Sequence, residues 1–338
     1  MNVHIETRTL NLRHTFTIAR GSSDEKHNVF LRIEKDGFIG WGEAAPNIRY
    51  SETPESATEA IGKLCEILPD DLSCYTPLLQ SMNDSIPGEY AAKAAVDMAV
   101  MDWVSQSYGI PLYKMWGLNP MSMPKTSMTI AIDTPAEMAK RALEAQQYEI
   151  LKIKLGTADD RAIIEAIRSV SDQAVRVDAN EGWLDRETAI SEIEWLAEKN
   201  VEIIEQPMPA SQLEDMAWLK KRSPLPLIAD EAFTTIKSLF DLKESYHGIN
   251  IKLMKCGGTQ AARDAVILAR ALDMSVMLGC MVESSVGIAA AAHIAPMVDY
   301  ADLDGNLLIS NDPFNGHPVV NGAVLLNSQP GLGVSMRA

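Results

Sequence analysis

The chain has 338 residues, of which 46% are hydrophobic, and its formal net charge is −16. This length favours one large and one small domain, and the acidic balance excludes a surface suited to nucleic-acid phosphates. No run of about eighteen uncharged apolar residues predicts a membrane span, and the first ten residues lack the apolar core of a secretory leader. We therefore expect a cytoplasmic protein whose four cysteines are reduced thiols.

The first fifty residues alternate apolar and polar side chains in short runs, a pattern typical of strands. Asp36 and Gly37 separate the runs NVFLRIEK and FIGWGEA and predict a hairpin turn. Helical spacing follows at residues 54–68 and 87–108. Residues 1–115 are therefore expected to form a small α+β domain.

From about residue 126 the pattern changes to short apolar runs that alternate with amphipathic helical segments. The eight runs are SMTIAI, ILKIKLG, AVRVDAN, VEIIEQP, PLIADE, GINIKLM, SVMLGC and DYADLDG. Alternation of this kind indicates parallel strands with right-handed crossovers, and eight units predict a closed (β/α)8-type barrel within an α/β fold. We place the barrel at residues 116–315. No helical pattern follows the eighth run, and strand-like runs in the tail, about 316–338, are expected to complete the small domain.

Charged side chains occur at the C-terminal ends of these otherwise apolar runs, where a strand buried on both faces would leave few charges. They are Lys152, Lys154, Asp178, Glu205, Asp230, Lys252, Asp302 and Asp304. Because all strands of a parallel barrel end at the same mouth, we expect these side chains to surround one site. Barrel enzymes keep their active sites at that mouth.

Three of these charges are carboxylates on consecutive runs, namely Asp178, Glu205 and Asp230. Converging carboxylates repel one another and raise one another's pKa unless a cation neutralises them. A site with oxygen ligands alone favours Mg²⁺, which leaves coordination positions for substrate oxygens. We therefore expect one Mg²⁺ per subunit at this triad, in preference to three separate solvated acids.

The lysines flank the triad. Two alternating lysines on an isolated strand would ordinarily mark a solvated edge, but Lys152 and Lys154 lie in a buried run. Lys252 lies four runs further on, on the opposite side of an eight-stranded barrel. A carboxylate held by a cation makes the adjacent C–H acidic by stabilising an enediolate. Two amines on opposite faces of that carbon then predict racemisation or epimerisation by two-base 1,1-proton transfer.

The motifs LKIKLG, VDANEGW, IEQPMP, ADEAF, INIKLMKCGG, LGCMVESS and DYADLDGN together resemble the muconate-lactonizing subgroup of the enolase superfamily. The resemblance is strongest to its dipeptide epimerases. It implies a modified TIM barrel with an N-terminal α+β capping domain. It also implies inversion of the α-carbon of the C-terminal residue of an L-X-L-Xaa dipeptide, with L-Ala-L-Glu as the default substrate.

The resemblance also implies roles for individual residues. Lys154 serves the L configuration, Lys252 serves the D configuration, and Lys152 supports Lys154 and the substrate carboxylate. Asp302 and Asp304 hold the free α-ammonium group of the dipeptide.

Other candidate residues surround these. Asn180 and Glu231 would lie just outside the metal ligands. The capping loops at 16–25 and 45–53 are expected to close over the mouth. Further candidate contacts to the substrate are Thr129, Arg20, Ser23, Arg49 and Cys280. A small buried filler is the alternative reading of Cys280, and a solvated loop residue is the alternative reading of the loop positions.

Other functions remain open at this point. The substrate is an acidic dipeptide, or a hydrophobic or other non-Glu dipeptide. N-acylamino acid racemase, o-succinylbenzoate synthase and cycloisomerase activities occur in the same subgroup, but their substrates lack a free ammonium group. A non-catalytic ligand-binding barrel would not need both Lys154 and Lys252. We expect a small dipeptide as partner and neither nucleic acid nor a membrane, and the sequence is also compatible with a homo-oligomer.

Overall fold

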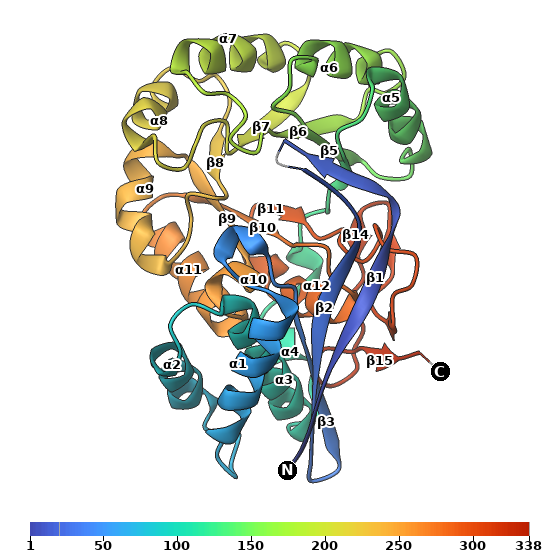
Figure 1. Cartoon of the computed structure of the whole chain (residues 1–338), viewed down its shortest axis with the longest axis vertical. Helices are drawn as coiled ribbons and strands as arrows, with labels where there is room; N and C mark the ends of the chain where they lie inside the picture. The colour runs from blue at the N-terminus through green and yellow to red at the C-terminus, as the bar shows by residue number, and fades with distance from the viewer. Residues whose placement is uncertain (20, 338) are drawn as a thin grey trace.

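The computed structural model describes residues 1–19 and 21–337. An antiparallel sheet with its helices, hereafter the cap, lies against one end of a barrel of parallel strands (Figure 1). The α/β barrel with an N-terminal α+β unit predicted from the sequence is thus confirmed. None of the helices in the described part of the chain has the length and apolar character that a membrane crossing requires.

The cap sheet consists of three antiparallel strands in the order β1 (Asn2–Ile18), β2 (Gly21–Lys35) and β3 (Phe38–Ala44). Asp36 and Gly37 form the turn between β2 and β3 with φ angles of 52° and 83°, as the sequence predicted. The cap helices and the segments that follow them are η1 (Ile48–Tyr50), α1 (Pro54–Glu66), α2 (Tyr75–Ser85), α3 (Tyr90–Ser107), α4 (Leu112–Met115) and η2 (Pro120–Ser122).

Helix α3 packs against β3 at unusually short range. A Cβ atom on Gly40 would lie 2.0 Å from the carbonyl oxygen of Ala99, and one on Gly42 would lie 1.9 Å from that of Ala95. The glycines of FIGWGEA lack side chains at the points where β3 meets the alanine-rich helix α3. Their absence allows the strand and the helix to approach so closely. The contact fixes β3 against α3 directly before the capping loop at 45–53.

The barrel strands coincide with the eight predicted runs. They are β4 (Met128–Ile130), β5 (Ile150–Lys154), β6 (Ala174–Asp178), β7 (Val201–Glu205), β8 (Leu227–Ala229), β9 (Gly248–Lys252), β10 (Ser275–Gly279) and β11 (Tyr300–Asp302). Each strand pairs with its sequence neighbour. A parallel bridge between Thr126 and Ala301 joins the segment before β4 to β11. The barrel closes there, so all eight strands direct their C-terminal ends to one mouth.

Helical segments connect successive strands of the barrel, and most of them cover its outside (Figure 1). They are α5 (Pro135–Glu144), α6 (Asp160–Arg168), α7 (Arg186–Ala197), α8 (Leu213–Lys220), η3 (Ile236–Ser238), α9 (Leu239–Ser245), α10 (Leu253–Cys256), α11 (Thr259–Ala271), α12 (Ser285–Ala292) and η4 (Ala295–Met297). As the sequence predicted, no helix follows β11 within the residues that the structure describes.

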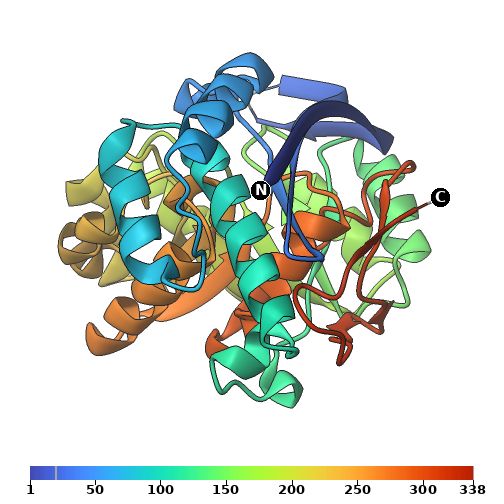
Figure 2. The ribbon, with the colours of Figure 1, turned by 90° about the horizontal axis from the view of Figure 1, so that it is seen from below.

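The tail after β11 runs back along the cap, beside the long β1–β2 hairpin (Figure 2). It contains two short antiparallel pairs, β12 (Phe314–Asn315) with β15 (Ser335–Met336) and β13 (Val319–Val320) with β14 (Ala323–Val324). Phe314 stacks on Phe30 of β2 with ring centroids 5.6 Å apart. The Leu332 N–H donates to Asp102 of α3 at 2.8 Å. The tail therefore packs on the cap, while the exact division between domains stays a prediction.

Candidate active site

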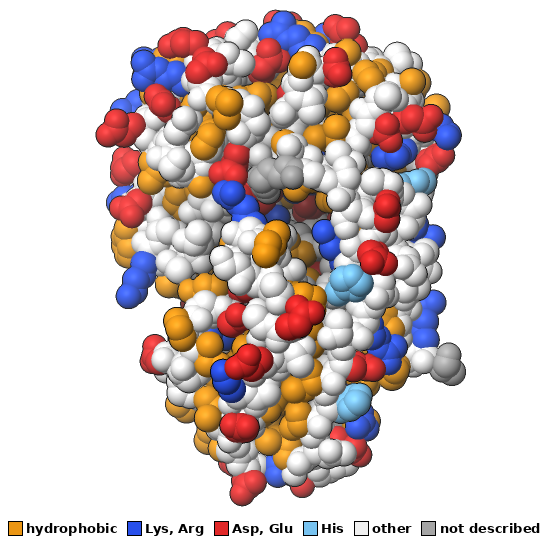
Figure 3. Space-filling model, viewed as in Figure 1, with side chains coloured by type: hydrophobic (Ala, Val, Ile, Leu, Met, Phe, Trp, Pro, Cys, Tyr) orange, Lys and Arg blue, Asp and Glu red, His pale blue; other side chains and the backbone are white. Residues whose placement is uncertain are grey.

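A cavity of about 590 Å³ lies between the cap and the mouth of the barrel. Figure 3 shows it as a hollow near the middle of the face, with Lys and Arg side chains at its edge. Its lining includes the predicted residues Ser23, Arg49, Thr129, Lys152, Lys154, Asn180, Asp230, Glu231, Lys252, Cys280, Asp302 and Asp304. Arg20 lies outside the described residues. The structure therefore brings nearly all the sequence candidates to one place.

The carboxylate triad lies at the inner end of this cavity. Asp178 and Glu205 are the last residues of neighbouring strands and face each other in register, and Asp230 directly follows β8. One oxygen from each lies within 4.8 Å of the others, and all three side chains are buried. Burial, together with the charge of Asp178, raises the pKa of Glu205 to about 8. Three buried oxygen donors that repel one another fit a hard divalent cation.

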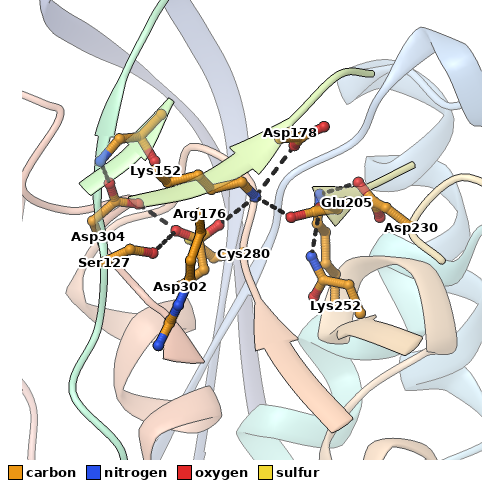
Figure 4. Close-up of polar contacts among 12 residues, drawn as sticks. Ser127, Lys152, Arg176, Asp178, Glu205, Asp230, Lys252, Cys280, Asp302 and Asp304 are labelled. Carbon is orange, nitrogen blue, oxygen red and sulfur yellow. Dashed lines mark hydrogen bonds and ion pairs between the residues drawn. The ribbon is translucent and has the colours of Figure 1, made fainter. Parts of the chain in front are cut away.

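Lys152 connects the triad with the eighth strand (Figure 4). Its ammonium nitrogen lies 2.7 Å from Glu205 Oε2, 2.7 Å from Asp302 Oδ2 and 3.2 Å from Asp178 Oδ2. Burial alone opposes the charged form, but these carboxylates outweigh it and hold the pKa of Lys152 well above its ordinary value. These three carboxylates therefore favour the charged form of Lys152.

The other two lysines contact different members of the triad from opposite sides. Lys154 Nζ lies 2.6 Å from Asp178 Oδ2, and Lys252 Nζ lies 2.8 Å from Asp230 Oδ2. Their strands β5 and β9 are separated by three strands in the sheet order, which places them across the barrel. Burial opposes the charge on Lys252, but Asp230 outweighs it and raises the pKa of Lys252. A divalent cation on the triad would offset that negative charge and favour the neutral amine.

Three polar residues that the sequence analysis did not single out hold the triad in place. Asn250 Nδ2 donates to Glu205 Oε1 at 2.8 Å, and Lys255 Nζ donates to the carbonyl oxygen of Asp230 at 2.6 Å. Gln206 Oε1 accepts the backbone N–H of Asp230 at 2.9 Å. Two of them could have been predicted from the sequence. Asn250 precedes Lys252 by two residues and therefore shares its strand face, and Lys255 follows in the same motif.

Asp302 and Asp304 differ in their surroundings. Asp302 Oδ1 accepts the Ser127 hydroxyl at 2.7 Å, and its other oxygen pairs with Lys152. Asp304 Oδ2 accepts the backbone N–H of Thr129 at 2.6 Å. Among the described residues no Lys or Arg forms an ion pair with Asp304. Burial and the neighbouring Asp302 raise the pKa of Asp304 to about 7. Asp304 therefore has no ion-pair partner among the described residues.

The remaining candidates surround this centre. The Asn180 N–H donates to Asp178 Oδ1 at 3.0 Å, and Asn180 Nδ2 donates to Glu231 Oε1 at 3.3 Å. Arg49 reaches from the cap to Glu181 with a separation of 2.7 Å. The Ser23 hydroxyl donates to its own strand. Cys280 is a desolvated thiol whose Sγ lies 4.0 Å from Asp304 Oδ1.

Comparison with known proteins agrees with this geometry. Residues 1–117 match the N-terminal domain family of mandelate racemase and muconate lactonizing enzyme. Residues 135–338 match the family described as enolase C-terminal domain-like. The chain belongs to the enolase superfamily.

Relatives of this superfamily member include named epimerases. The L-Ala-D/L-Glu epimerase of Bacteroides thetaiotaomicron is 47% identical over 96% of this chain and 85% of the relative. The L-Ala-D/L-amino acid epimerase of Pedosphaera parvula is 41% identical over 100% of both chains. The structure of a substrate-liganded L-Ala-D/L-Glu epimerase from Bacillus subtilis superposes with a TM-score of 0.92 at 32% identity, covering 99% of this chain and 98% of that one.

Proposed function

We propose that this enolase-superfamily isomerase is a Mg²⁺-dependent dipeptide epimerase. The observation that carries the proposal is the placement of two lysines on opposite sides of one carboxylate triad, each within hydrogen-bond distance of a different carboxylate. A carbon held between them can lose its proton on one face and regain one on the other. Structures of related dipeptide epimerases from Cytophaga hutchinsonii and Enterococcus faecalis contain Mg and a dipeptide, which supports Mg²⁺ as the metal here.

Each group at the mouth has a defined part in this reaction. Asp178, Glu205 and Asp230 would hold the Mg²⁺, whose charge makes the α-proton of a bound carboxylate more acidic. Lys152, which stays charged, stabilises the negative charge that develops on the substrate carboxylate. Lys154 removes the α-proton from the L residue, and Lys252 donates a proton to the opposite face. One C–H bond breaks and one forms, so no redox partner is needed.

The free amino group of a dipeptide has a matching partner in Asp304. An α-ammonium group provides the cation that this carboxylate lacks within the described chain, and Asp302 lies beside it. An N-acylamino acid, the substrate of a racemase in the same subgroup, has no such cation. We therefore favour dipeptides over N-acyl substrates.

Two kinds of side chain are candidates for the residue that is epimerised. L-Ala-L-Glu is the default substrate, supported by the name of the Bacteroides relative. A hydrophobic dipeptide is the second candidate, because a relative from a Flavobacteria bacterium that is 36% identical is named a hydrophobic dipeptide epimerase.

A dipeptide library incubated with Mg²⁺ in D₂O tests the proposal. We expect deuterium at the α-carbon of the C-terminal residue, detected by mass spectrometry, and inversion of that centre, detected by chiral chromatography. N-acetyl and N-succinyl amino acids serve as matched substrates without an ammonium group. Absence of exchange with every dipeptide would contradict the assignment, and faster exchange with the N-acyl compounds would indicate a racemase instead.

A further inference from the structure

A second cavity of about 620 Å³ has no part in the reaction described above. It lies between β1, β4, the end of α5 and the tail after β11, on the side of the molecule where Figure 1 shows β1, α5 and the tail together. The three triad carboxylates and the three lysines of the mouth do not line it. It is about as large as the cavity at the mouth, so a small molecule fits inside it.

Two arginines in the wall of this second cavity have no carboxylate partner. Arg13 Nε donates to the carbonyl oxygen of Leu307 at 3.0 Å, and Arg337 Nε donates to that of Phe314 at 3.0 Å. Neither arginine forms an ion pair within the part of the chain that the structure describes, although the formal net charge is −16. The carbonyl oxygens hold both side chains and leave their terminal nitrogen atoms as donors, which suits an anionic ligand.

The same wall also offers a negative charge and an unused acceptor. Glu144 lines the cavity and has no ion-pair partner among residues 1–19 and 21–337. Asn306 Nδ2 donates to Ser285 Oγ at 3.2 Å, but its buried Oδ1 has no hydrogen-bond partner in the described chain. A buried acceptor without a partner costs free energy, which a donor on a ligand would recover.

The other Arg and acidic side chains of the wall are already satisfied. Arg141 pairs with Asp133 at 2.8 Å. Asp312 Oδ2 accepts the Ser285 hydroxyl at 2.6 Å, and its Oδ1 accepts the Phe314 N–H at 3.0 Å. The charges left for a ligand are therefore two cations and one carboxylate.

This combination of charges matches an acidic α-amino acid. Glutamate has two carboxylates for Arg13 and Arg337 and one ammonium group for Glu144. The ammonium group also supplies a donor for Asn306 Oδ1. Inorganic phosphate has no positive group, and glutamine has only one carboxylate, so both satisfy fewer of these residues.

The two cavities share part of their walls. Phe16, Thr129 and Leu308 line both of them. The Thr129 N–H donates to Asp304 Oδ2 at 2.6 Å, and the Leu308 N–H donates to the carbonyl oxygen of Asp304 at 3.2 Å. A ligand that shifts this wall also shifts the carboxylate assigned to the substrate ammonium group, so binding at the two sites is linked.

We propose that this cavity is a second, regulatory site that binds an acidic α-amino acid. The site goes beyond the proposed function, because its occupation is measured without turnover. Only its effect on KM depends on the epimerase reaction.

Calorimetry with L-glutamate, D-glutamate, L-glutamine and inorganic phosphate as probes tests the binding. The titrations are made with Mg²⁺ and again with EDTA, because the mouth needs Mg²⁺ to hold an α-carboxylate and the second cavity does not. We expect one enantiomer of glutamate to bind under both conditions, about tenfold or more tightly than glutamine or phosphate. Equal binding of glutamine, binding of phosphate alone or binding of no probe would overturn the proposal.

Arg13→Gln locates the binding site. It should raise the Kd of glutamate by about tenfold or more, because a charge-assisted hydrogen bond is lost, and Arg13→Lys should raise it less. Arg8→Gln is the matched control, because Arg8 lies on the same strand and pairs with Glu6 at 2.7 Å outside the cavity. The same Kd in Arg13→Gln and the unmodified protein would overturn the site.

The regulatory role is tested with the Mg²⁺-loaded enzyme and a dipeptide that it epimerises. Saturating glutamate should change KM by about fivefold or more, and Arg13→Gln should remove this change. A change that persists in Arg13→Gln would indicate competition at the mouth and overturn the regulatory role, as would an unchanged KM in the unmodified enzyme. None of these results affects α-proton exchange itself, so they are distinguishable from a failure of the proposed epimerase.

Discussion

Lys152 Nζ lies 2.7 Å from Asp302 Oδ2 at the seam where the barrel closes, and this ion pair distinguishes the two aspartates of the eighth strand. Asp302 forms an ion pair with Lys152, whereas Asp304 has no such partner among the described residues. The two carboxylates should therefore respond differently to neutralisation.

Asp304→Asn should raise KM for L-Ala-L-Glu by about 10- to 100-fold with a smaller effect on kcat, because a charge-assisted hydrogen bond to the substrate ammonium is lost. Asp302→Asn should also lower kcat, because Lys152 loses one of the carboxylates that position it. Steady-state kinetics separates the two effects, and Mg²⁺ binding measured by calorimetry controls for damage to the triad. Identical changes in kcat and KM for both variants would contradict this division.

Lys252→Ala should abolish epimerisation and retain α-proton exchange from the L residue. Lys154 contacts the triad from the opposite side and is left in place by the substitution. Proton NMR in D₂O, started separately from L-Ala-L-Glu and L-Ala-D-Glu, measures exchange from each epimer. Lys154→Ala is the mirror-image control and should exchange only the D epimer. Equal exchange of both epimers by a single-lysine variant would mean that one base serves both faces.

Substrate binding should weaken as the pH falls through about 7. Burial and Asp302 raise the pKa of Asp304 to about 7, so the neutral acid predominates below that pH and cannot pair with an ammonium group. KM should then rise by up to about tenfold per pH unit. The measurement is KM for L-Ala-L-Glu between about pH 5.5 and 8.5, and Asp304→Asn should lose this dependence. A flat profile in the unmodified protein would show that Asp304 does not bind the ammonium group.

Mg²⁺ should stabilise the folded protein as well as activate it. Three buried carboxylates repel one another, and a cation that binds only the folded state at about 100 times its Kd adds about 2.7 kcal/mol to the free energy of unfolding. We expect EDTA to abolish activity and to lower Tm by a few degrees, with both restored by Mg²⁺. Glu205→Gln should remove most of the Mg²⁺-dependent rise in Tm. Equal Tm values with EDTA and with Mg²⁺ would contradict metal binding at the triad.

Two glycine substitutions test the close contact inside the cap. In Gly42→Ala the new Cβ would lie 1.9 Å from the carbonyl oxygen of Ala95, so strand and helix must separate. We expect a loss of about 3 kcal/mol or more in the free energy of unfolding, as for overpacked cores. Gly62→Ala, in helix α1, meets nothing within 4 Å and should stabilise by about 1 kcal/mol. Urea denaturation compares the two, and equal stability would refute the close packing.

The barrel was predictable because its strands are buried on both faces. Such strands leave continuous apolar runs, and the charges that interrupt them at one end mark the mouth. This pattern located Asp178, Glu205 and Asp230, whose oxygens the structure brings within 4.8 Å of one another. The lysines on β5 and β9 followed from the same argument, because strand count alone places them on opposite sides.

Other features of the site depend on contacts between residues far apart in the sequence, and a local sequence pattern does not indicate such contacts. The difference between Asp302 and Asp304 arises from Lys152 and Ser127, which are more than a hundred residues away in sequence. The tail was expected to return to the small domain, but no sequence pattern indicated that it contacts Asp102.

That contact has a consequence for how the chain is made. Asp102 accepts the backbone N–H groups of Trp41 and of Leu332, which are 61 and 230 residues away from it in sequence. During translation the first part of the cap emerges long before Leu332 is synthesised. The hydrogen bond between Asp102 and Leu332 therefore cannot form until the whole barrel has been synthesised. Contacts of such long range slow folding, and the cap reaches its final form only as translation ends.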